Sequence, residues 1–439
     1  MKAHFFELSE RLAREVRAGE ILLCNFGGER SDFVRFNRGK VRQGGSVEQR
    51  SLSLRLIHAG RQVSASLELA GEAGDYELAR TILAKLRGDS LAGLPEDPWL
   101  LINEEPRSTD HERRGALASA EAVVEEAIGA AGSRDFVGIY AGGTICRGFA
   151  NSLGQRNWHE VDSFNFDWSL YLRADKAVKS VYAGFDWDAA TFREKVEAGA
   201  AQLGQLALPA RTLPPGEYRA YLAPRALEEL VGMLAWGGFS ARARETRQSP
   251  LLRMQEGATL SASITFRENT AEGVAPAFQG DGFVKPASVT LIEGGRLKDA
   301  LVSPRSAKEY NQQTNAANGG ESPESLDMAA GELDEGDVLQ ELGTGLYISN
   351  LWYLNFSDRS AGRITGMTRF ATFWIENGRI AAPVDPVRFD DSIYRMLGEN
   401  LVALTRTREL LLDPSTYGAR STASARLPGA LLRALRFTL

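Results

Sequence analysis

The sequence predicts an α+β protein: an N-terminal domain of antiparallel strands plus helices, then a C-terminal mainly-β domain with a curved-sheet or barrel-like arrangement. Three observations predict this fold class. The chain has 439 residues, which is too long for one ordinary core and favours two domains. Residues 345–383 hold short runs of β-branched and aromatic residues separated by turn residues, as in a β-meander. Within that stretch Asn377 and Gly378 favour a type I′ hairpin, because both central residues of this turn need φ > 0.

The N-terminal domain is predicted over residues 1–205. It begins with an amphipathic helix, because Phe5, Leu8, Leu12 and Val16 form one apolar stripe. Strands and turns follow over residues 21–69 and 136–172, and further helices are expected at residues 75–86, 116–131 and 191–205. Residues 141–144, Ala-Gly-Gly-Thr, predict a turn between two of the later strands.

Residues 206–216 contain three prolines and predict a linker, because proline excludes helix and favours an extended spacer. The C-terminal domain is then expected over residues 217–439. It should begin with a strand and a helix from Pro224 to about Ser240, which has a stripe of buried leucine and valine residues. Residues 311–332 are polar and rich in Gly, Asn and Ser, and predict a long mobile loop or lid.

Composition excludes several classes of protein. The formal net charge is −6, and no run of Lys and Arg is interleaved with aromatic residues, so no nucleic-acid partner is expected. No apolar stretch is long enough for a membrane span, and the charged N-terminus lacks the pattern of a signal peptide, so we expect a cytoplasmic protein. The two cysteines, Cys24 and Cys146, have no CxxC partner and are expected to be buried, reduced thiols.

The residue pattern predicts neither a catalytic residue nor a metal ligand in this chain. No GxSxG elbow or phosphate-binding loop occurs. None of the histidines has a second histidine three to five residues away; they are His4, His58, His111 and His159. A site made only of carboxylates stays open as an alternative, although Asp281 and Asp358 lie in turns where Asp usually caps its own backbone.

Several segments resemble the TldD/PmbA family of metallopeptidases: VRFNRGKVRQ near the start, GLYISNLW, TRFATFWIENGRIAAPV and the closing LPGALLRALRF. The resemblance implies that the helix after the first C-terminal strand carries an HExxxH zinc motif in catalytic members. Those positions fall on Gly232, Met233 and Gly237 here, and none of the three can bind zinc or activate water. The stretch from Tyr417 to Ala425 also lacks the cysteine that the catalytic branch has near its C-terminus. The chain thus resembles the TldE (PmbA) branch.

This resemblance implies a non-catalytic subunit that binds no cofactor itself, paired with a zinc-bearing TldD-like metallopeptidase subunit in a heterodimer. An extended peptide would be held in the cavity between the subunits. The residues expected to line it are Trp236, Arg242, Arg244, Asn350 and Trp352. The tryptophans could equally pack in a core, and the arginines could lie on a solvated face. Two alternatives stay open: a homodimeric peptide-binding protein without catalysis, and an active hydrolase with an atypical site.

Overall fold

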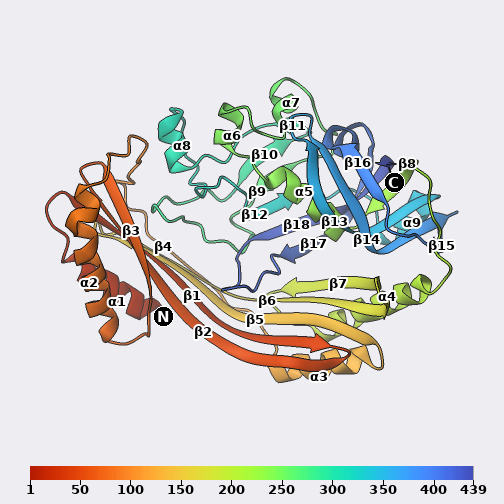
Figure 1. Ribbon diagram of the computed structural model, residues 1–439, viewed down its shortest axis with the longest axis horizontal. Helices are drawn as coiled ribbons and strands as arrows, with labels where there is room; N and C mark the ends of the chain where they lie inside the picture. The colour runs from red at the N-terminus through yellow and green to blue at the C-terminus, as the bar shows by residue number, and fades with distance from the viewer. Residues whose placement is uncertain (439) are drawn as a thin grey trace.

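The computed structural model describes residues 1–438, apart from the side chains of residues 89 and 90; the predicted domain end, Leu439, lies outside the described residues. Figure 1 shows two large sheets, one formed by the N-terminal half of the chain and the other by the C-terminal half. The predicted α+β fold class is therefore confirmed. No helix of the described residues is both long enough and apolar enough to cross a membrane.

Seven strands of the described chain form the N-terminal sheet, in the order β3-β2-β1-β5-β6-β4, with β7 also paired to β6. Every pairing is antiparallel except that of β4 with β6. The strands are β1 (Glu20–Asn37), β2 (Lys40–His58), β3 (Arg61–Glu68), β4 (Thr109–Arg113), β5 (Asp135–Asn151), β6 (Arg156–Arg173) and β7 (Lys176–Gly184).

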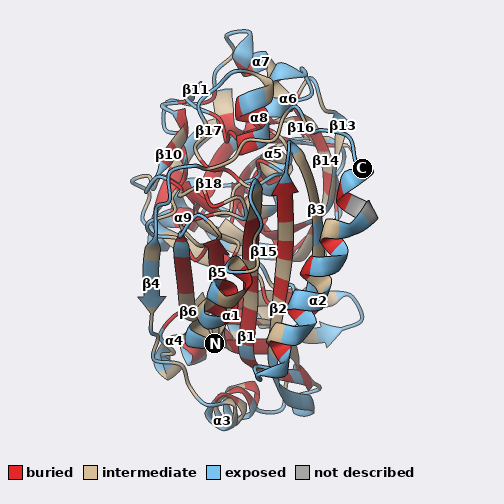
Figure 2. Ribbon diagram, turned by 90° about the vertical axis from the view of Figure 1, so that its left-hand side faces the viewer, coloured by how far each residue is buried: buried red, intermediate tan, exposed pale blue. Residues whose placement is uncertain are grey.

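Four helices cover one face of this sheet. They are α1 (Lys2–Ala13), α2 (Gly74–Lys85), α3 (Ala120–Ala131) and α4 (Ala189–Leu206). Along β1 the even-numbered apolar residues, such as Phe26 and Phe36, pack under these helices. Side chains alternate between the two faces of a strand, so the odd-numbered residues of β1 point to the opposite face. Figure 2 shows bands of buried and intermediate residues along β2, where positions 51–56 alternate between the two.

The odd-numbered face lies toward the C-terminal half of the chain and carries buried polar residues as well as buried apolar ones. Glu29 and Ser31 of β1, and His159 and Ser163 of β6, are buried polar residues. The His159 Nε2 atom lies 2.9 Å from the backbone oxygen of Val274, which belongs to the C-terminal half. Polar contacts of this kind therefore join the two halves.

The C-terminal sheet has eleven described strands, in the order β11-β10-β9-β12-β18-β16-β14-β13-β8, with β15 beside β14 and β17 beside β18. An additional pairing between β18 and β8 closes β8, β13, β14, β16 and β18 into a ring. The strands are β8 (Gly216–Leu222), β9 (Phe266–Glu268), β10 (Val289–Glu293), β11 (Arg296–Leu297), β12 (Ser325–Met328), β13 (Gly345–Asp358), β14 (Arg363–Glu376), β15 (Arg379–Pro383), β16 (Arg388–Ser392), β17 (Leu401–Leu412) and β18 (Ser424–Phe437). The sheet is thus curved and partly closed, as the sequence predicts.

The principal helix of this half, α5 (Pro224–Ala235), packs its apolar stripe against β13 and β18. Short helices complete the C-terminal half: α6 (Ala241–Glu245), α7 (Leu252–Gln255), α8 (Pro304–Glu309) and α9 (Val338–Leu342). The chain passes from one sheet to the other between Leu206 and Gly216, where the Arg211 backbone N–H donates to the Pro383 oxygen (2.8 Å). The division into two domains with a linker here stays a prediction.

Local turn chemistry behaves as the sequence predicts. Asn377 and Gly378 have φ angles of 50° and 75°, which confirms the type I′ turn between β14 and β15. Arg38 and Gly39, at the turn between β1 and β2, have φ angles of 53° and 66°. These two-residue turns fix the register of both hairpins.

The predicted turn at residues 141–144 is wrong, because β5 runs through this stretch without interruption. Gly143 faces Ser31 of β1. A Cβ atom on Gly143 would lie 2.2 Å from the backbone oxygen of Arg30. The glycine therefore serves close approach of two strands rather than a change of direction.

The predicted C-terminal extent of the first helix of this half is also wrong. The helix α5 ends at Ala235 rather than near Ser240, because Gly237 adopts φ 84° and the Gly238 N–H donates to the Leu234 oxygen (2.8 Å). Ser240 then caps the separate helix α6.

The predicted mobile lid at residues 311–332 is a packed segment that includes β12. Glu321 is fully buried, and its carboxylate accepts hydrogen bonds from the Ser240 hydroxyl (2.6 Å), the Arg242 N–H (2.9 Å) and the Ser303 N–H (2.9 Å). Burial alone would raise the pKa of Glu321, but these hydrogen bonds lower it. One carboxylate thus accepts hydrogen bonds from backbone N–H groups at the N-termini of both α6 and α8.

Replacing Gly143 with Ala should destabilise the protein by about 1–3 kcal/mol, because the new methyl group would push β5 away from β1. Gly129→Ala is the control: this glycine lies in α3, and a Cβ there would meet no atom within 4 Å. The control should be neutral or stabilise the protein by up to about 1 kcal/mol. Urea unfolding of both variants measures the difference, and equal midpoints would contradict the close-approach role of Gly143.

Candidate functional site

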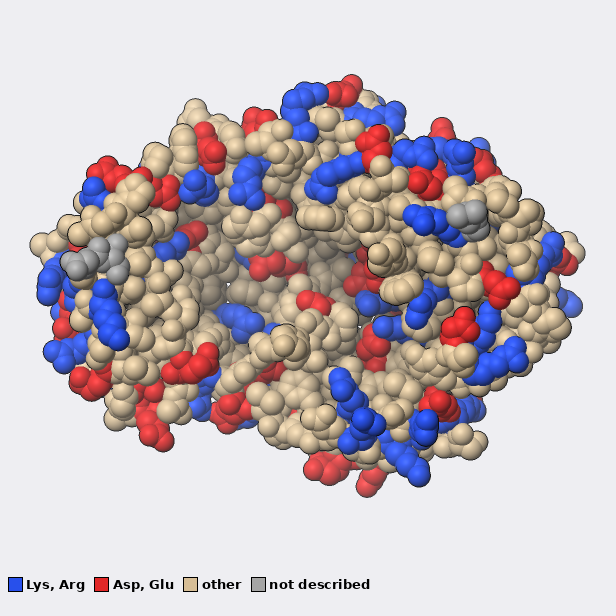
Figure 3. Space-filling view, viewed as in Figure 1, with Lys and Arg blue, Asp and Glu red and all other residues tan. Residues whose placement is uncertain are grey.

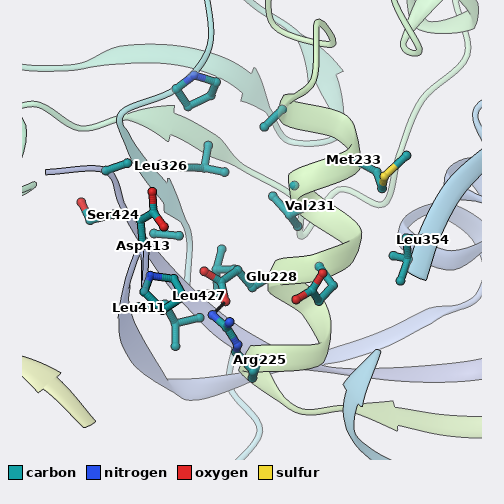
Figure 4. A pocket seen from close by; sticks show the side chains of 17 residues that line it. Arg225, Glu228, Val231, Met233, Leu326, Leu354, Leu411, Asp413, Ser424 and Leu427 are labelled. Carbon is teal, nitrogen blue, oxygen red and sulfur yellow. Dashed lines mark hydrogen bonds and ion pairs between the residues drawn. The ribbon is translucent and has the colours of Figure 1, made fainter. Parts of the chain in front are cut away.

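A cavity of about 450 Å³ lies beside α5 and is the candidate functional site. Its walls come from α5, from β12 and the residue Pro323 before it, from β13, and from β18 and the end of β17. The apolar lining includes Val231, Met233, Leu326, Leu354, Leu411 and Leu427, and the charged lining comprises Arg225, Glu228, Glu229 and Asp413. Figure 4 shows Glu228 on the side of α5 that faces Asp413 and Ser424, and Met233 on the side that faces Leu354. A mostly apolar cavity with a few charged groups is typical of a ligand site.

The positions that correspond to the family's zinc motif lie at this cavity and at the end of α5. Gly232 and Met233 both line the cavity, and a Cβ on Gly232 would meet no atom within 4 Å. Gly237 lies two residues beyond the last residue of α5, with φ 84°. The space for larger side chains is therefore present at Gly232, whereas the helical spacing is lost at Gly237.

The charged side chains of α5 were not among the predicted site residues. Glu228 forms an ion pair with Arg225, one turn earlier in the helix. Burial raises the pKa of Glu228 to about 7, because the lowering effect of Arg225 is weaker and Glu229 and Glu409 add repulsion. Glu228 precedes Gly232 by four residues, so the two share one helix face. That spacing is the sequence signal that could have identified Glu228.

The residues at α5 do not fit zinc. The cavity lining offers carboxylates but neither histidine nor cysteine, and the carboxylate of Glu228 is already engaged by Arg225. In the part of the chain that the structure describes, no group of three or more His, Cys, Asp or Glu side chains could hold a metal ion.

Two of the predicted site residues, Trp236 and Trp352, are exposed aromatic residues rather than core residues. Trp236 directly follows α5 and is 64% exposed, and its ring centroid lies 6.3 Å from that of Phe356 in β13. Trp352 in β13 is 49% exposed and lies 5.6 Å from the ring of its neighbour Tyr353, which is 77% exposed. We call Trp236, Trp352 and Tyr353 the aromatic surface.

The other predicted residues have different surroundings. Asn350 of β13 is buried, and its side-chain oxygen accepts a hydrogen bond from the Ser349 hydroxyl (2.8 Å). Arg242 lies on α6 with an exposed side chain. Arg244, also on α6, donates to the Asp299 backbone oxygen (2.5 Å), and burial lowers the pKa of Arg244. The arginines therefore belong to α6 and its neighbours, while the tryptophans belong to the end of α5 and to β13.

The loop between β17 and β18, residues 413–423, which we call the connecting loop, reaches from the α5 cavity to the N-terminal sheet. Asp413, Pro414 and Ala423 line the α5 cavity. Arg420 lies against the N-terminal sheet with only 5% of its surface exposed. Figure 3 shows a hollow between the two halves, where acidic and basic side chains both gather. The connecting loop therefore couples the candidate site to the other half of the chain.

These features define a class: an α+β protein in which a ring of strands packs on a helix with an adjoining cavity, joined to a long, mainly antiparallel sheet. The family model of the PmbA/TldA metallopeptidase C-terminal domain matches residues 215–438, just over half of the chain. The chain therefore belongs to the PmbA/TldA metallopeptidase family, as its sequence motifs predict. No curated protein matches the chain.

Three solved structures share the fold over essentially the whole chain. TldE from Thermococcus kodakarensis has a TM-score of 0.81 at 16% identity, with 99% of this chain and 100% of that chain covered. A modulator of a DNA gyrase from Thermotoga maritima gives 0.77 at 17% identity, with 99% and 100% covered. A modulator of DNA gyrase from Bacteroides thetaiotaomicron gives 0.78 at 15% identity, with 100% and 98% covered. At these identities the likeness establishes the fold alone.

The raised pKa of Glu228 predicts a pH-dependent stability. A carboxyl group whose pKa rises from 4.5 to about 7 on folding stabilises the folded state at low pH, and this contribution is lost as the pH rises through 7. Glu228→Gln cannot titrate. As the pH rises from 5 to 8, the free energy of unfolding of Glu228→Gln should therefore increase relative to that of the original protein, by up to about 3 kcal/mol.

Thermal unfolding of both proteins at several pH values measures this change. Glu125→Gln, on the exposed face of α3 in the N-terminal half, is the matched control. A stability difference between the original protein and Glu228→Gln that stays constant from pH 5 to pH 8 would contradict the assignment.

Proposed function

We propose that this chain is a non-catalytic, TldE/PmbA-like subunit that assembles in the cytoplasm with a zinc-bearing, TldD-like metallopeptidase subunit. The single observation that carries the proposal is the state of α5. The helix keeps its apolar stripe and an adjoining cavity, while the positions of the zinc motif are occupied by Gly232, Met233 and Gly237. A subunit with this helix can shape a cavity but lacks the groups for zinc-dependent hydrolysis.

The aromatic surface supports a partner at this end of the protein. Large exposed aromatic side chains are enriched in protein interfaces and usually cost solubility when they stay uncovered. The guanidinium of Arg369 lies 4.2 Å from the ring centroid of Trp352, and that of Arg359 lies 5.1 Å from the ring centroid of Trp236. Arginine and tryptophan are both enriched among the residues that contribute most to binding in protein interfaces. We infer that the TldD-like subunit covers this surface.

The α5 cavity supports a role in holding peptide. Its apolar walls suit side chains of a substrate, and the charged groups at Glu228 and Asp413 can select among them. In this proposal an extended peptide lies between the subunits, is retained by this chain and is cut at the zinc of the partner.

The proposal is tested by metal analysis and peptidase assays on the purified chain, alone and mixed with a TldD-like protein from the same genome. We expect no stoichiometric zinc and no cleavage by the chain alone, and cleavage in the mixture above that of the TldD-like protein alone. About one zinc per chain, with cleavage by this chain alone, would favour an active hydrolase with an atypical site. A stable homodimer that ignores the TldD-like protein would favour a peptide-binding protein without catalysis.

The aromatic surface can be tested separately by replacing Trp352 and Tyr353 with Ser. The double variant should bind the TldD-like subunit at least about tenfold more weakly, because each lost aromatic residue removes apolar contact area from the interface. Tyr417→Ser is the matched control, since Tyr417 is 99% exposed but lies in the connecting loop. Surface plasmon resonance measures both affinities, and equal weakening by the control would argue against a specific interface at β13.

A further inference from the structure

A second groove, distant in sequence from α5, lies on the face of the N-terminal sheet that is turned away from its helices. It has a volume of about 300 Å³ and is lined by β1, β2, β5 and the connecting loop. Its length follows β1 from Glu29 to Arg35, a span of about 20 Å at the rise of a strand. We call it the Glu29 groove.

Glu29 has an unusual environment for a carboxylate. Only 2% of the residue is exposed. Its Oε2 atom accepts hydrogen bonds from the Gln49 side-chain amide (3.0 Å) and the Arg420 backbone N–H (3.0 Å). Its Oε1 atom is buried and has no hydrogen-bond partner among the described residues.

No cation within the described chain pairs with this carboxylate. The guanidinium groups of Arg147 and Arg420 interact with the charge of Glu29, but neither forms an ion pair with it within 4.0 Å. The guanidinium of Arg420 is instead engaged with β5, β6 and Ser31. Buried carboxylates are normally paired and fully hydrogen-bonded, so Glu29 lacks a donor with positive charge.

The groove is shaped to admit an extended chain. Gly44 and Gly45 of β2 line it, and a Cβ on Gly45 would meet no atom within 4 Å. A glycine inside a strand often marks a place where a ligand or another backbone approaches closely. The partner strand β3 pairs only with residues 51–58 of β2, so residues 40–50 form the described edge of the sheet here.

The remaining lining suits a peptide. Phe33, Val47 and Ile139 offer apolar contacts for side chains, and Gln43 offers hydrogen bonds for a backbone. The volume lies at the lower end of the range for ligand pockets, which suits the first residues of a peptide rather than a folded protein.

We propose that the Glu29 groove binds the N-terminal segment of an extended peptide, with the peptide's free ammonium group donating to Glu29 Oε1. An ammonium group supplies three donors and the missing positive charge. A lysine side chain carries the same group, so the test must separate the two sources. The site needs no partner subunit and no catalysis, so its failure would leave the proposed subunit role untouched.

The probe is the peptide Ala-Val-Ala-Ser-Ala with a C-terminal fluorescein, and its binding to the full chain is measured by fluorescence anisotropy. Acetylation of the probe's N-terminus should weaken binding about ten- to hundredfold, as expected for loss of a charge-assisted hydrogen bond. Glu29→Gln should weaken binding of the free-amine probe and bring the two probes to similar affinity.

Gly45→Leu should abolish binding of the probe by filling the groove, without disturbing the sheet. Gly129→Leu, at an equally open glycine in α3 on the opposite face, is the control and should bind like the original protein. Gly45→Leu also keeps the test decisive if Glu29→Gln fails to fold, which circular dichroism would reveal.

Equal affinity of the free and acetylated probes, or no binding of either, would overturn the proposal. An acetylated probe that carries lysine in its first position separates the two ammonium sources. If it bound as tightly as the free-amine probe, the N-terminal assignment would be wrong, whereas weak binding of it would support that assignment.

Discussion

The buried guanidinium of Arg420 fixes the connecting loop on three strands of the N-terminal sheet. It donates to the Ser31 hydroxyl (3.2 Å), the Gly143 oxygen (3.2 Å) and the Ser163 oxygen (2.7 Å) and hydroxyl (2.9 Å). These acceptors belong to β1, β5 and β6, which are neighbours in the sheet. A buried cation without such acceptors would cost several kcal/mol, so all three strands must keep their register. Gly143 contributes twice, because its lack of a side chain also lets β1 and β5 approach closely.

The position of the connecting loop follows from this contact. Once Arg420 is fixed on the sheet, the residues on either side of it border three cavities: Asp413 the α5 cavity, Gly418 the Glu29 groove, and Thr422 a third cavity of about 390 Å³. The backbone N–H of Arg420 donates to Oε2 of Glu29. The other oxygen, Oε1, has no hydrogen-bond partner among the described residues. Fixing the two halves and leaving Glu29 incompletely satisfied are therefore two results of one packing arrangement.

Features encoded by neighbouring residues could be predicted from the sequence, and features encoded by distant residues could not. The Asn377-Gly378 turn and the apolar stripe of α5 depend on residues within a few positions of each other, and both were predicted. The packing of Glu321 depends on Ser240 and Ser303, 81 and 18 residues away, so its segment resembled a mobile loop. Gly143 resembled a turn residue, because the strand that it approaches is more than one hundred residues earlier in the chain. The candidate site follows the same division: Gly232 and Met233 were located by motif, but the cavity that they line also needs β12, β17 and β18.

The residues of α5 that pack in the core are different from the positions that correspond to the family's zinc motif. The buried residues Leu227, Leu230, Val231 and Leu234 fix α5 against the ring, and none of them is a motif position. A Cβ atom on Gly232 would meet no atom within 4 Å, so a glycine at this position costs little packing energy. The positive φ of Gly237 ends the helix, and the guanidinium of Arg359, the residue after β13, donates to the neighbouring Trp236 oxygen. The packing of α5 against the ring and the hydrogen bond at its C-terminal end are therefore made by residues other than the three motif positions.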